Sequence, residues 1–301
     1  MQAPKIAVIG SINMDLVTTS ERFPQPGETL LGSGFTQFTG GKGANQAVAA
    51  ARLGASVSLI GAVGDDGFGR TLLESLQREG VDTNAVHIAA GHPSGMANIT
   101  VAQGDNHIIV VSGANFALSA ESVRQEKARI AEADVVMAQL ETPLEAVIEA
   151  AKLARKHGKP FILNPAPAQA LPAQLLELVD VLTPNAYELA ISLSLPENLS
   201  PEELVVQAPC QVVMTLGAEG ALFSDAEGRQ HRQSSFRVTP VDTTGAGDTF
   251  NGALARYWSR GLSEAVRLAC AAAALSVTRA GAQSGMPDEA ALQAFLQTSE
   301  S

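Results

Sequence analysis

Short apolar runs alternate with helix-like patterns through most of the chain. The runs that we interpret as strands cover Lys5–Ile9, Ser56–Val63, Asp134–Ala138, Pro160–Leu163, Val179–Leu182 and Val212–Leu216. Helical patterns follow nearly all of them, and this alternation is typical of βα units around a parallel sheet. We therefore predict the α/β class, with a doubly wound, mainly parallel sheet flanked by helices in a single domain over residues 1–301.

Two stretches, Leu16–Thr39 and Met96–Val111, interrupt this pattern. In both of them apolar and polar residues alternate, as in Phe35–Phe38, which is typical of strands with one exposed face. We expect a small antiparallel β sheet, built from about residues 14–40 and 93–112, that acts as a lid and keeps water from a reaction. The alternative is a simple extension of the main sheet.

Composition and charge narrow the classes of partner. Hydrophobic residues make up 46% of the chain and aromatic residues only 4%, so small aliphatic side chains must fill the core. The net charge of −11 would repel nucleic acid and anionic membranes. The most apolar stretch, Ala269–Val277, is too short to span a bilayer. The first residues do not have the pattern of a signal peptide, and the two cysteines fit a reducing compartment. We therefore expect a cytoplasmic protein that binds neither nucleic acid nor membrane.

A glycine-rich turn leads into a helix near residue 245. Gly245, Ala246 and Gly247, which we call the anion cradle, have little or no side chain, so their N–H groups can approach a phosphate. The helix N-terminus adds about half a positive charge there. Asp248 follows in the first helical turn, where it could act as a catalytic base. The alternative is a carboxylate that only stabilises the helix dipole.

As a base, Asp248 would face a large mismatch in pKa. A carboxylate with a pKa of ~3.9 cannot deprotonate an alcohol whose pKa resembles that of water, ~15.7, because the difference corresponds to about 16 kcal/mol. Prior formation of an alkoxide is therefore excluded. In a loose phosphoryl-transfer transition state the hydroxyl group becomes acidic only as its bond to phosphorus forms, and the carboxylate can accept the proton late.

A second glycine-rich turn, Gly40–Gly43, precedes an alanine-rich helix. It is not a Walker motif, because glycine follows Lys42 where serine or threonine is required, and it lacks the dinucleotide-binding pattern. We expect Lys42 and Asn45 to hydrogen-bond the hydroxyl groups of a sugar. Open α/β sheets bind ligands at the carboxyl ends of their strands, where further polar residues follow two predicted strands. The resulting polar cluster consists of Asn13, Asp15, Lys42, Asn45 and Glu141.

With these motifs the chain resembles the ribokinase family of carbohydrate kinases. The resemblance covers nearly the whole chain and is carried by the segments Gly10–Asp15, Pro26–Thr29, Gly40–Asn45, Asn164–Pro167, Thr183–Glu188 and Asp242–Asp248. It implies a kinase that uses ATP, Mg²⁺ and a monovalent cation, normally K⁺. The acceptor that it implies is a small sugar, with D-ribose and its conversion to D-ribose 5-phosphate as the first expectation.

The resemblance also implies roles for individual residues. Asp248 corresponds to the base, beside the anion cradle. The residues that correspond to the sugar site are Asn13, Met14, Asp15, Gly41, Lys42, Gly43, Asn45 and Glu141. Those that correspond to the site of the nucleotide and its Mg²⁺ are Asn185, Glu188, Thr215, Gly217, Gly220, Gly247 and Cys270. Those that correspond to the monovalent-cation site are Asp242, Thr244, Ser276, Arg279, Gly281 and Gly285.

Three of these positions are unusual. Cys270 stands where the family often has a side chain that faces adenine, and Gly285 replaces a residue that can carry a hydroxyl group. Met14 lies between two expected sugar ligands and could touch an apolar ring face or pack in the core. For Met14 we expect core packing.

Three other functions share parts of this pattern. The family also contains kinases for deoxyribose, fructose-type sugars and nucleosides, and a non-catalytic sugar sensor would keep the fold. A dehydrogenase would also use a doubly wound sheet, but its dinucleotide fingerprint is absent after the first predicted strand. Finally, an exposed apolar face on the lid would favour a homodimer formed through the lid sheet.

Overall fold

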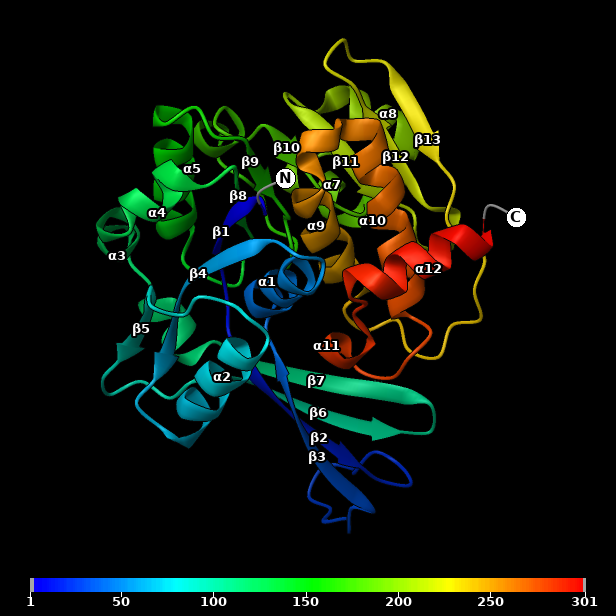
Figure 1. Ribbon diagram of the computed structural model, residues 1–301. Helices are drawn as coiled ribbons and strands as arrows, with labels where there is room; N and C mark the ends of the chain where they lie inside the picture. Colours follow the sequence, from blue (N-terminus) through cyan, green and yellow to red (C-terminus); the bar gives the residue numbers. More distant parts are fainter. Residues whose placement is uncertain (1–2, 300–301) are drawn as a thin grey trace.

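A mainly parallel sheet forms the centre of the computed structural model, which describes residues 3–299 (Figure 1). Neighbouring strands from β11 to β5 pair in parallel, and β12 and β13 continue the sheet antiparallel. The order of the strands is β13 (Gln230–Gln233), β12 (Ala221–Ser224), β11 (Gln211–Thr215), β10 (Val181–Leu182), β9 (Phe161–Leu163), β8 (Val135–Ala138), β1 (Lys5–Ile9), β4 (Ser56–Gly64) and β5 (Val86–Ala89). The predicted parallel sheet is confirmed, and the sequence analysis missed β5, β12 and β13 at its two edges.

Helices cover both faces of this sheet. Alternate residues of β1 enter different apolar clusters, Ile6 and Val8 in one and Ala7 and Ile9 in the other, as a doubly wound sheet requires. The first cluster contains side chains of α1 (Lys42–Arg52), α2 (Gly67–Arg78), α9 (Ala246–Arg256), α10 (Leu262–Ser276) and α12 (Glu289–Ser299). The second contains side chains of α3 (Ala120–Gln125), α4 (Lys127–Glu132), α5 (Leu144–Lys156), α6 (Ala173–Leu176), α7 (Ala186–Ser192) and α8 (Pro201–Gln207). The predicted doubly wound α/β class is therefore confirmed.

Short helices complete the described chain. They are the 3-10 turns η1 (Gly113–Ala117), η2 (Gly217–Glu219) and η3 (Trp258–Arg260), and the helix α11 (Ala282–Gly285) between α10 and α12. Across residues 3–299, none of the helices combines the length and the apolar character needed to cross a bilayer.

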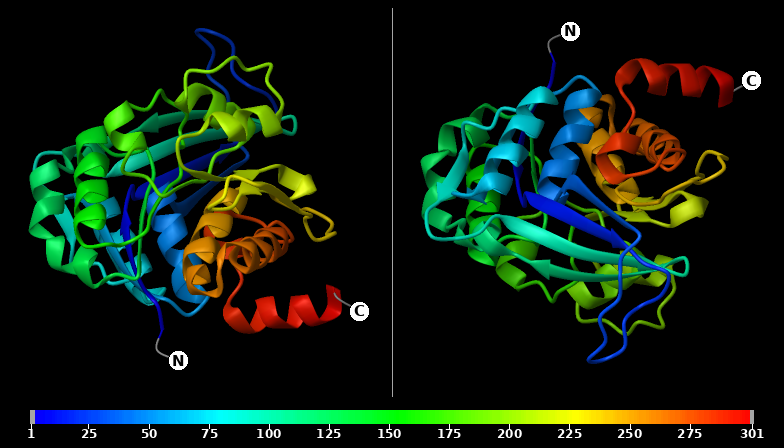
Figure 2. Two further views of the ribbon diagram at one scale, coloured as in Figure 1. Left: turned by 90° about the horizontal axis from the view of Figure 1, so that it is seen from above. Right: turned by 90° about the horizontal axis from the view of Figure 1, so that it is seen from below.

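A second, smaller sheet extends away from the main one (Figures 1 and 2). Its strands, in spatial order, are β3 (Gly34–Gly40), β2 (Asn13–Thr19), β6 (Gly95–Ala102) and β7 (Asp105–Val111), and we call it the lid sheet. The pairs β2–β3 and β6–β7 are antiparallel, as predicted, whereas β2 and β6 join the two hairpins in parallel. Since β2 already begins at Asn13, two expected sugar ligands, Asn13 and Asp15, belong to the first lid strand.

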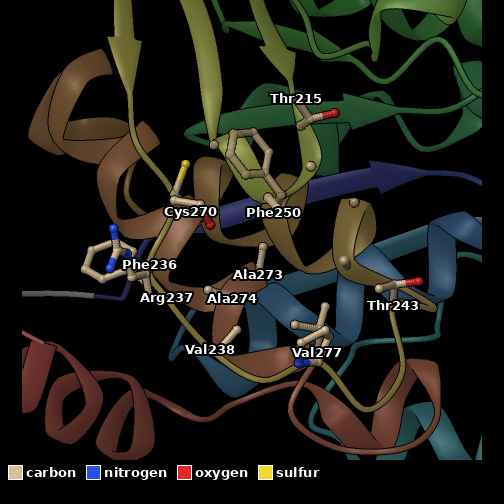
Figure 3. A pocket seen from close by; sticks show the side chains of 17 residues that line it. Thr215, Phe236, Arg237, Val238, Thr243, Phe250, Cys270, Ala273, Ala274 and Val277 are labelled. Atoms are coloured by element: carbon tan, nitrogen blue, oxygen red, sulfur yellow. The ribbon is translucent and has the colours of Figure 1, made fainter.

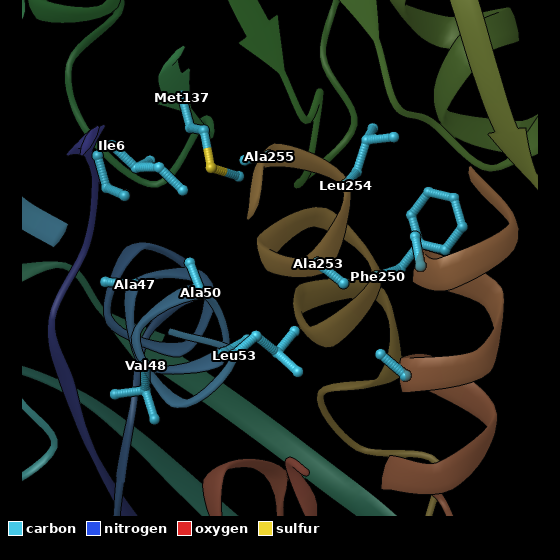
Figure 4. Close-up of a cluster of buried hydrophobic side chains, with 14 of the residues drawn as sticks. Ile6, Ala47, Val48, Ala50, Leu53, Met137, Phe250, Ala253, Leu254 and Ala255 are labelled. Carbon is cyan, nitrogen blue, oxygen red and sulfur yellow. The ribbon is translucent and has the colours of Figure 1, made fainter. Parts of the chain in front are cut away.

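The helices α1 and α9 pack directly against each other beside the main sheet (Figure 4). Small side chains line the contact, among them Ala50 and Ala253. A Cβ atom added to Gly252 would lie 2.6 Å from the Ala49 Cβ and 2.7 Å from the Gln46 carbonyl oxygen, so only glycine fits there. Both helices follow glycine-rich turns, and their close contact brings the first turn of α1 to the first turn of α9.

Candidate active site

Asp248 lies in the first turn of α9 and is almost completely buried, with 8% of its surface exposed. Two amides from the start of α1 hold its carboxylate. Asn45 Nδ2 donates to Asp248 Oδ2 (2.9 Å) and Gln46 Nε2 donates to Asp248 Oδ1 (3.0 Å). A helix-capping carboxylate would instead bond the backbone of its own helix, so these long-range bonds favour a functional role for Asp248.

The charges around Asp248 are arranged about a single ammonium group. Burial raises the pKa of Asp248, although the Lys42 ammonium and the two amides partly oppose this effect. Burial alone would lower the pKa of Lys42, but the nearby carboxylates of Asp248, Glu141 and Glu188 outweigh it and leave a raised value. Lys42 therefore stays protonated and can stabilise negative charge that develops beside Asp248.

A polar cavity of about 360 Å³ opens at the start of α9. The anion cradle, Lys42 and Asp248 line it. A Cβ atom on Gly247 would point into open space, whereas one on Gly245 would lie 2.9 Å from the Ala282 Cβ, and Gly245 has φ 76°. The Ala246 N–H donates to the Thr243 carbonyl oxygen (3.2 Å), so this amide is turned into the loop. Gly247 is therefore the part of the cradle that a phosphate can approach most closely.

Asn185 and Glu188 stand at the edge of the same cavity. They form a capping box at the start of α7, in which Asn185 Oδ1 accepts the Glu188 N–H and Glu188 Oε2 accepts the Asn185 N–H, both at 2.8 Å. Burial raises the pKa of Glu188. The capping box fixes both side chains beside the anion cradle, in the same cavity.

The polar cluster expected to hold a sugar gathers next to this cavity. Asn13 Oδ1 accepts a hydrogen bond from Asn115 Nδ2 (2.6 Å), which directs the amide nitrogen of Asn13 away from Asn115. Glu141 Oε2 accepts the Lys42 N–H (3.1 Å). Burial, together with the charges of Glu141 and Asp248, raises the pKa of Asp15 to about 6. The cluster thus offers both amide donors and carboxylate acceptors for hydroxyl groups.

Three residues assigned to the sugar site have mainly structural surroundings. Met14 is 2% exposed and packs in the core, as expected from the sequence. A Cβ atom on Gly43 would lie 2.5 Å from the Gly10 carbonyl carbon, and one on Gly41 would lie 2.8 Å from the Asn13 nitrogen. The two glycines therefore let α1 approach the chain between β1 and β2, and they position the side chains of the cluster.

A larger, mostly apolar cavity of about 590 Å³ adjoins the polar one, since Thr215, Gly217, Ala246 and Gly247 line both (Figure 3). Gly220 and Cys270 line the larger cavity as well. Burial raises the pKa of the Cys270 thiol to about 12, so this side chain stays neutral and forms an apolar wall. An apolar cavity that continues into the anion cradle is suited to a nucleotide.

The residues expected at the monovalent-cation site also lie together. Asp242 Oδ1 accepts the Thr244 N–H (2.9 Å) and Asp242 Oδ2 accepts the Gly281 N–H (2.8 Å). Burial alone would raise the pKa of Asp242, but these hydrogen bonds outweigh it and keep the carboxylate ionised. The carbonyl oxygens of Ser276 and Arg279 converge on Gly285, where an added Cβ atom would lie 2.5 Å and 3.4 Å from them. This set of oxygen atoms fits a hard cation, and Gly285 adds no side-chain ligand.

A divalent ion such as Mg²⁺ would need ligands other than those of the monovalent-cation site. Within residues 3–299, no group of three or more histidine, cysteine, aspartate or glutamate side chains is arranged to hold a metal ion. Mg²⁺ commonly keeps several waters and binds through one or two carboxylates together with substrate phosphates. The single Glu188 carboxylate beside the anion cradle fits that mode.

Several uncharged residues of the site were missed by the sequence analysis. Gln139 Nε2 donates to Gln46 Oε1 (2.7 Å), and Gln46 Nε2 also donates to Asn164 Oδ1 (3.1 Å). Gln283 and Asn115 hold Asn45 and Asn13 in the same way. A signal was present for Gln46, because an amide among the alanines of a buried helix must find partners.

Comparison with known proteins identifies a family. The model of the pfkB family of carbohydrate kinases matches residues 3–289. The ribokinase of Haemophilus influenzae is 43% identical over 97% of this chain and 98% of its own length, and that of Bacillus subtilis is 44% identical over 97% and 99%. The structure of Arabidopsis thaliana ribokinase in complex with ribose and ATP superposes with a TM-score of 0.92 at 32% identity and covers 99% of both chains.

Proposed function

Because the chain belongs to the pfkB family of carbohydrate kinases, we propose that it transfers the γ-phosphoryl group of ATP to the 5-hydroxyl group of D-ribose. Curated ribokinases that match over nearly their whole length support ribose as the acceptor. The observation that carries the proposal is the position of Asp248. Its buried carboxylate stands between the anion cradle and the polar cluster, where an acceptor hydroxyl group would meet a phosphate.

The polar cluster binds and orients the sugar in this proposal. Ionised Asp15 accepts hydrogen bonds from ring hydroxyl groups, and Asn13 donates one. Because Glu141 is bonded to the backbone of Lys42, a sugar that contacts Glu141 also fixes the turn that carries Lys42. Orientation of the acceptor in this way removes much of the entropic barrier to the transfer.

Asp248 then receives the proton of the acceptor hydroxyl group late in the reaction. Burial raises its pKa, which reduces the mismatch with the alcohol but does not remove it. The two amides from Asn45 and Gln46 oppose the rise in the pKa of Asp248 and hold its carboxylate in one orientation before the sugar arrives. Proton transfer therefore accompanies formation of the oxygen–phosphorus bond.

Charge stabilisation comes from the groups that line the polar cavity. Lys42 and Gly247 line this cavity, so in this proposal the Lys42 ammonium and the Gly247 N–H at the start of α9 would stabilise the charge of the transferred phosphoryl group. Asn185 and Glu188 would hold Mg²⁺ on the nucleotide phosphates, where the ion neutralises their charge. The apolar cavity beside Cys270 would receive adenine.

A monovalent cation is part of the proposal at the oxygen site beside α11. Asp242 links the loop before the anion cradle to Gly281, so a cation bound there, normally K⁺, would order the loop that leads into the cradle. Gly285 contributes no hydroxyl ligand, and a Cβ atom there would lie 2.5 Å from the Ser276 carbonyl oxygen, so we expect a serine at this position to displace that oxygen and to weaken cation binding.

A homodimer through the lid sheet is also proposed. The lid exposes apolar side chains on both of its faces, which is costly in water for a single chain. Paired strands place Val110 on the same face as Asp15, and Ile109 on the opposite face. The exposed set comprises Phe35, Phe38, Ile108, Ile109, Val110 and Val111.

A panel of sugars, assayed for ADP release with MgATP and K⁺, tests the proposed function. We expect the highest kcat/KM with D-ribose and much lower values with deoxyribose, fructose and nucleosides. Turnover on another sugar with none on ribose would refute ribose as the acceptor. Sugar binding with no turnover on any of these acceptors would support a non-catalytic sugar sensor.

A further inference from the structure

The side chain of Gln283 lies where three distant elements meet. It belongs to the short helix α11, between the expected cation ligands Gly281 and Gly285, and 9% of its surface is exposed. Gln283 Nε2 donates to Asn45 Oδ1 on α1 (3.0 Å), and Gln283 Oε1 accepts the hydroxyl of Thr39 on the lid strand β3 (2.7 Å). Both ends of this one amide are therefore used, each by a different part of the molecule.

These bonds fix which way round the Asn45 amide stands. Because Asn45 Oδ1 accepts from Gln283, the Asn45 nitrogen must point to the other side, and there it donates to Asp248 Oδ2 (2.9 Å). A reversed Asn45 amide would place its carbonyl oxygen against the carboxylate and its nitrogen against another N–H donor. In the series of hydrogen bonds from Thr39 through Gln283 and Asn45 to Asp248, each side chain therefore donates to the next one.

The backbone around Gln283 is held firmly enough to transmit this direction of donation. Arg52 Nη1 donates to the carbonyl oxygens of Gln283 and Met286, and Arg52 is itself paired with Glu79. On the lid side, Thr39 is next to Gly40, where strand β3 ends and the turn into α1 begins. A displacement of β3 relative to α11 would break the Thr39 bond and free the Gln283 amide to rotate.

We propose that Gln283 is a positioning residue, which couples the place of the lid strand β3 to the orientation of Asn45 and, through it, of the base Asp248. The inference rests on the proposed function, because it assumes that Asp248 accepts the acceptor proton. Gln283 itself lines neither the polar cavity nor the apolar one. Its effect is to present Asp248 in the reactive orientation when β3 is in the place that the structure shows.

Replacement of Gln283 by methionine tests this coupling, since methionine has similar length but cannot donate to Asn45 Oδ1. We expect kcat with ribose to fall by about 10- to 100-fold, with KM for ATP changed by no more than about twofold. The acid limb of the kcat profile should move to higher pH, because the Asn45 bond lowers the pKa of Asp248. The charged groups that face Asp248 are unchanged in this variant: Lys42 on α1, Glu141 after β8, Asp15 on β2 and Glu188 on α7.

Two further variants sharpen the test. Gln283→Glu keeps the shape but, when ionised, can only accept, so it should reverse the Asn45 amide and lower kcat at least as far as methionine does. Ser284→Ala alters the next residue of α11, whose hydroxyl donates to the Ala280 carbonyl oxygen, and should keep the wild-type kcat and pH profile. If Gln283→Met does not fold, Thr39→Val carries the test, with a smaller fall in kcat and a shift of the acid limb in the same direction.

The outcomes separate the inference from the function on which it rests. No turnover of any sugar by the wild-type chain would overturn the proposed function. Wild-type turnover with an unchanged kcat and acid limb in Gln283→Met, or full activity in Gln283→Glu, would overturn the role of Gln283. An equal fall in Ser284→Ala would also overturn it, because the effect would then come from a general disturbance of α11.

Discussion

At the scale of single residues, the site concentrates carboxylates around one ammonium group at a cost in stability. Burial, Glu141 and Asp248 together raise the pKa of Asp15 from 3.8 to about 6. The folded chain therefore binds the Asp15 proton more tightly than the unfolded chain does. Stability contributed by this group is complete below pH 3.8 and is lost as the pH rises through about 6.

Asp15→Asn should therefore stabilise the free protein while it damages sugar binding. The difference in Tm between variant and wild type should grow as the pH is raised from 3.8 through about 6 and stay constant above that range. KM for ribose at neutral pH should rise by about 10- to 100-fold, because hydrogen bonds to an ionised acceptor are lost. Thermal melts across this pH range and steady-state kinetics measure both effects. A Tm difference that does not vary with pH would contradict the assigned pKa.

The sequence predicted the charged residues of the site far better than its amides. Asp248 and Lys42 stand next to glycine-rich turns, and this local pattern is visible in one segment of chain. Gln139 and Gln283 carry no charge and follow no such turn, and they reach the site only because β8 and α11 lie beside α1 in the folded chain. An isolated glutamine in a sequence is most often an exposed surface residue, so nothing local distinguished these two.

At the scale of the elements, the contact between α1 and α9 positions the base. Asn45 and Gln46 can reach Asp248 only because Gly252 lets the two helix backbones approach. Alanine is a better helix former than glycine in general, so propensity alone predicts that Gly252→Ala would be favourable. The space around Gly252 predicts the opposite, since the new Cβ atom would lie 2.7 Å from the Gln46 carbonyl oxygen.

Gly252→Ala should lower the free energy of unfolding by about 1–3 kcal/mol, which is the usual effect of overpacking a core. It should also lower kcat, because α1 must move away from α9 and take Gln46 with it. Gly67→Ala at the start of α2 is the matched control: a Cβ atom there meets nothing within 4 Å, so stability and turnover should be kept. Chemical denaturation and steady-state kinetics of the pair decide the point, and equal stability of the two variants would contradict the close contact.

The sequence predicted the order of strands and helices along the chain better than it predicted which strands pair with each other in the sheets. Alternating strands and helices fix the parallel centre of the sheet, because a helix between two strands returns the chain in the same direction. The parallel pairing of β2 with β6 was not predicted, since these strands are separated by three strands, β3, β4 and β5, and two helices, α1 and α2, and no local signal links them. β12 and β13 were missed because they are short strands at the edge of the sheet.

At the scale of the whole molecule, the lid sheet exposes several large apolar side chains, among them Ile109 and Phe35. Its strand β7 is exposed along its whole length, although four of its seven residues are isoleucine or valine. A second copy of the chain would cover part of this apolar surface and hold the lid sheet in place over the polar cluster. The dimer would then contribute to turnover as well as to stability.

Ile109→Lys should weaken the proposed dimer. Ile109 is 67% exposed and lies on the lid face opposite Asp15, so a charge there should disturb a contact between two lids without entering the sugar site. Size-exclusion chromatography with light scattering should show the mass of two chains for the wild type and a shift toward one chain for the variant. A wild-type chain that is monomeric at all concentrations would contradict the dimer.

Asp248 connects all three scales, because its carboxylate depends on two amides, on the contact of two helices and on the lid strand. The most direct test of the account is ribose-dependent ADP release by Asp248→Ala at saturating MgATP, with calorimetry of ribose binding on the same protein. We predict a fall in kcat of about 10²- to 10⁴-fold with ribose binding retained. The control is Asp288→Ala, which removes a carboxylate that accepts the Ala291 N–H at the start of α12 and should keep full turnover. Near-normal turnover by Asp248→Ala would contradict the assignment of Asp248 as the base.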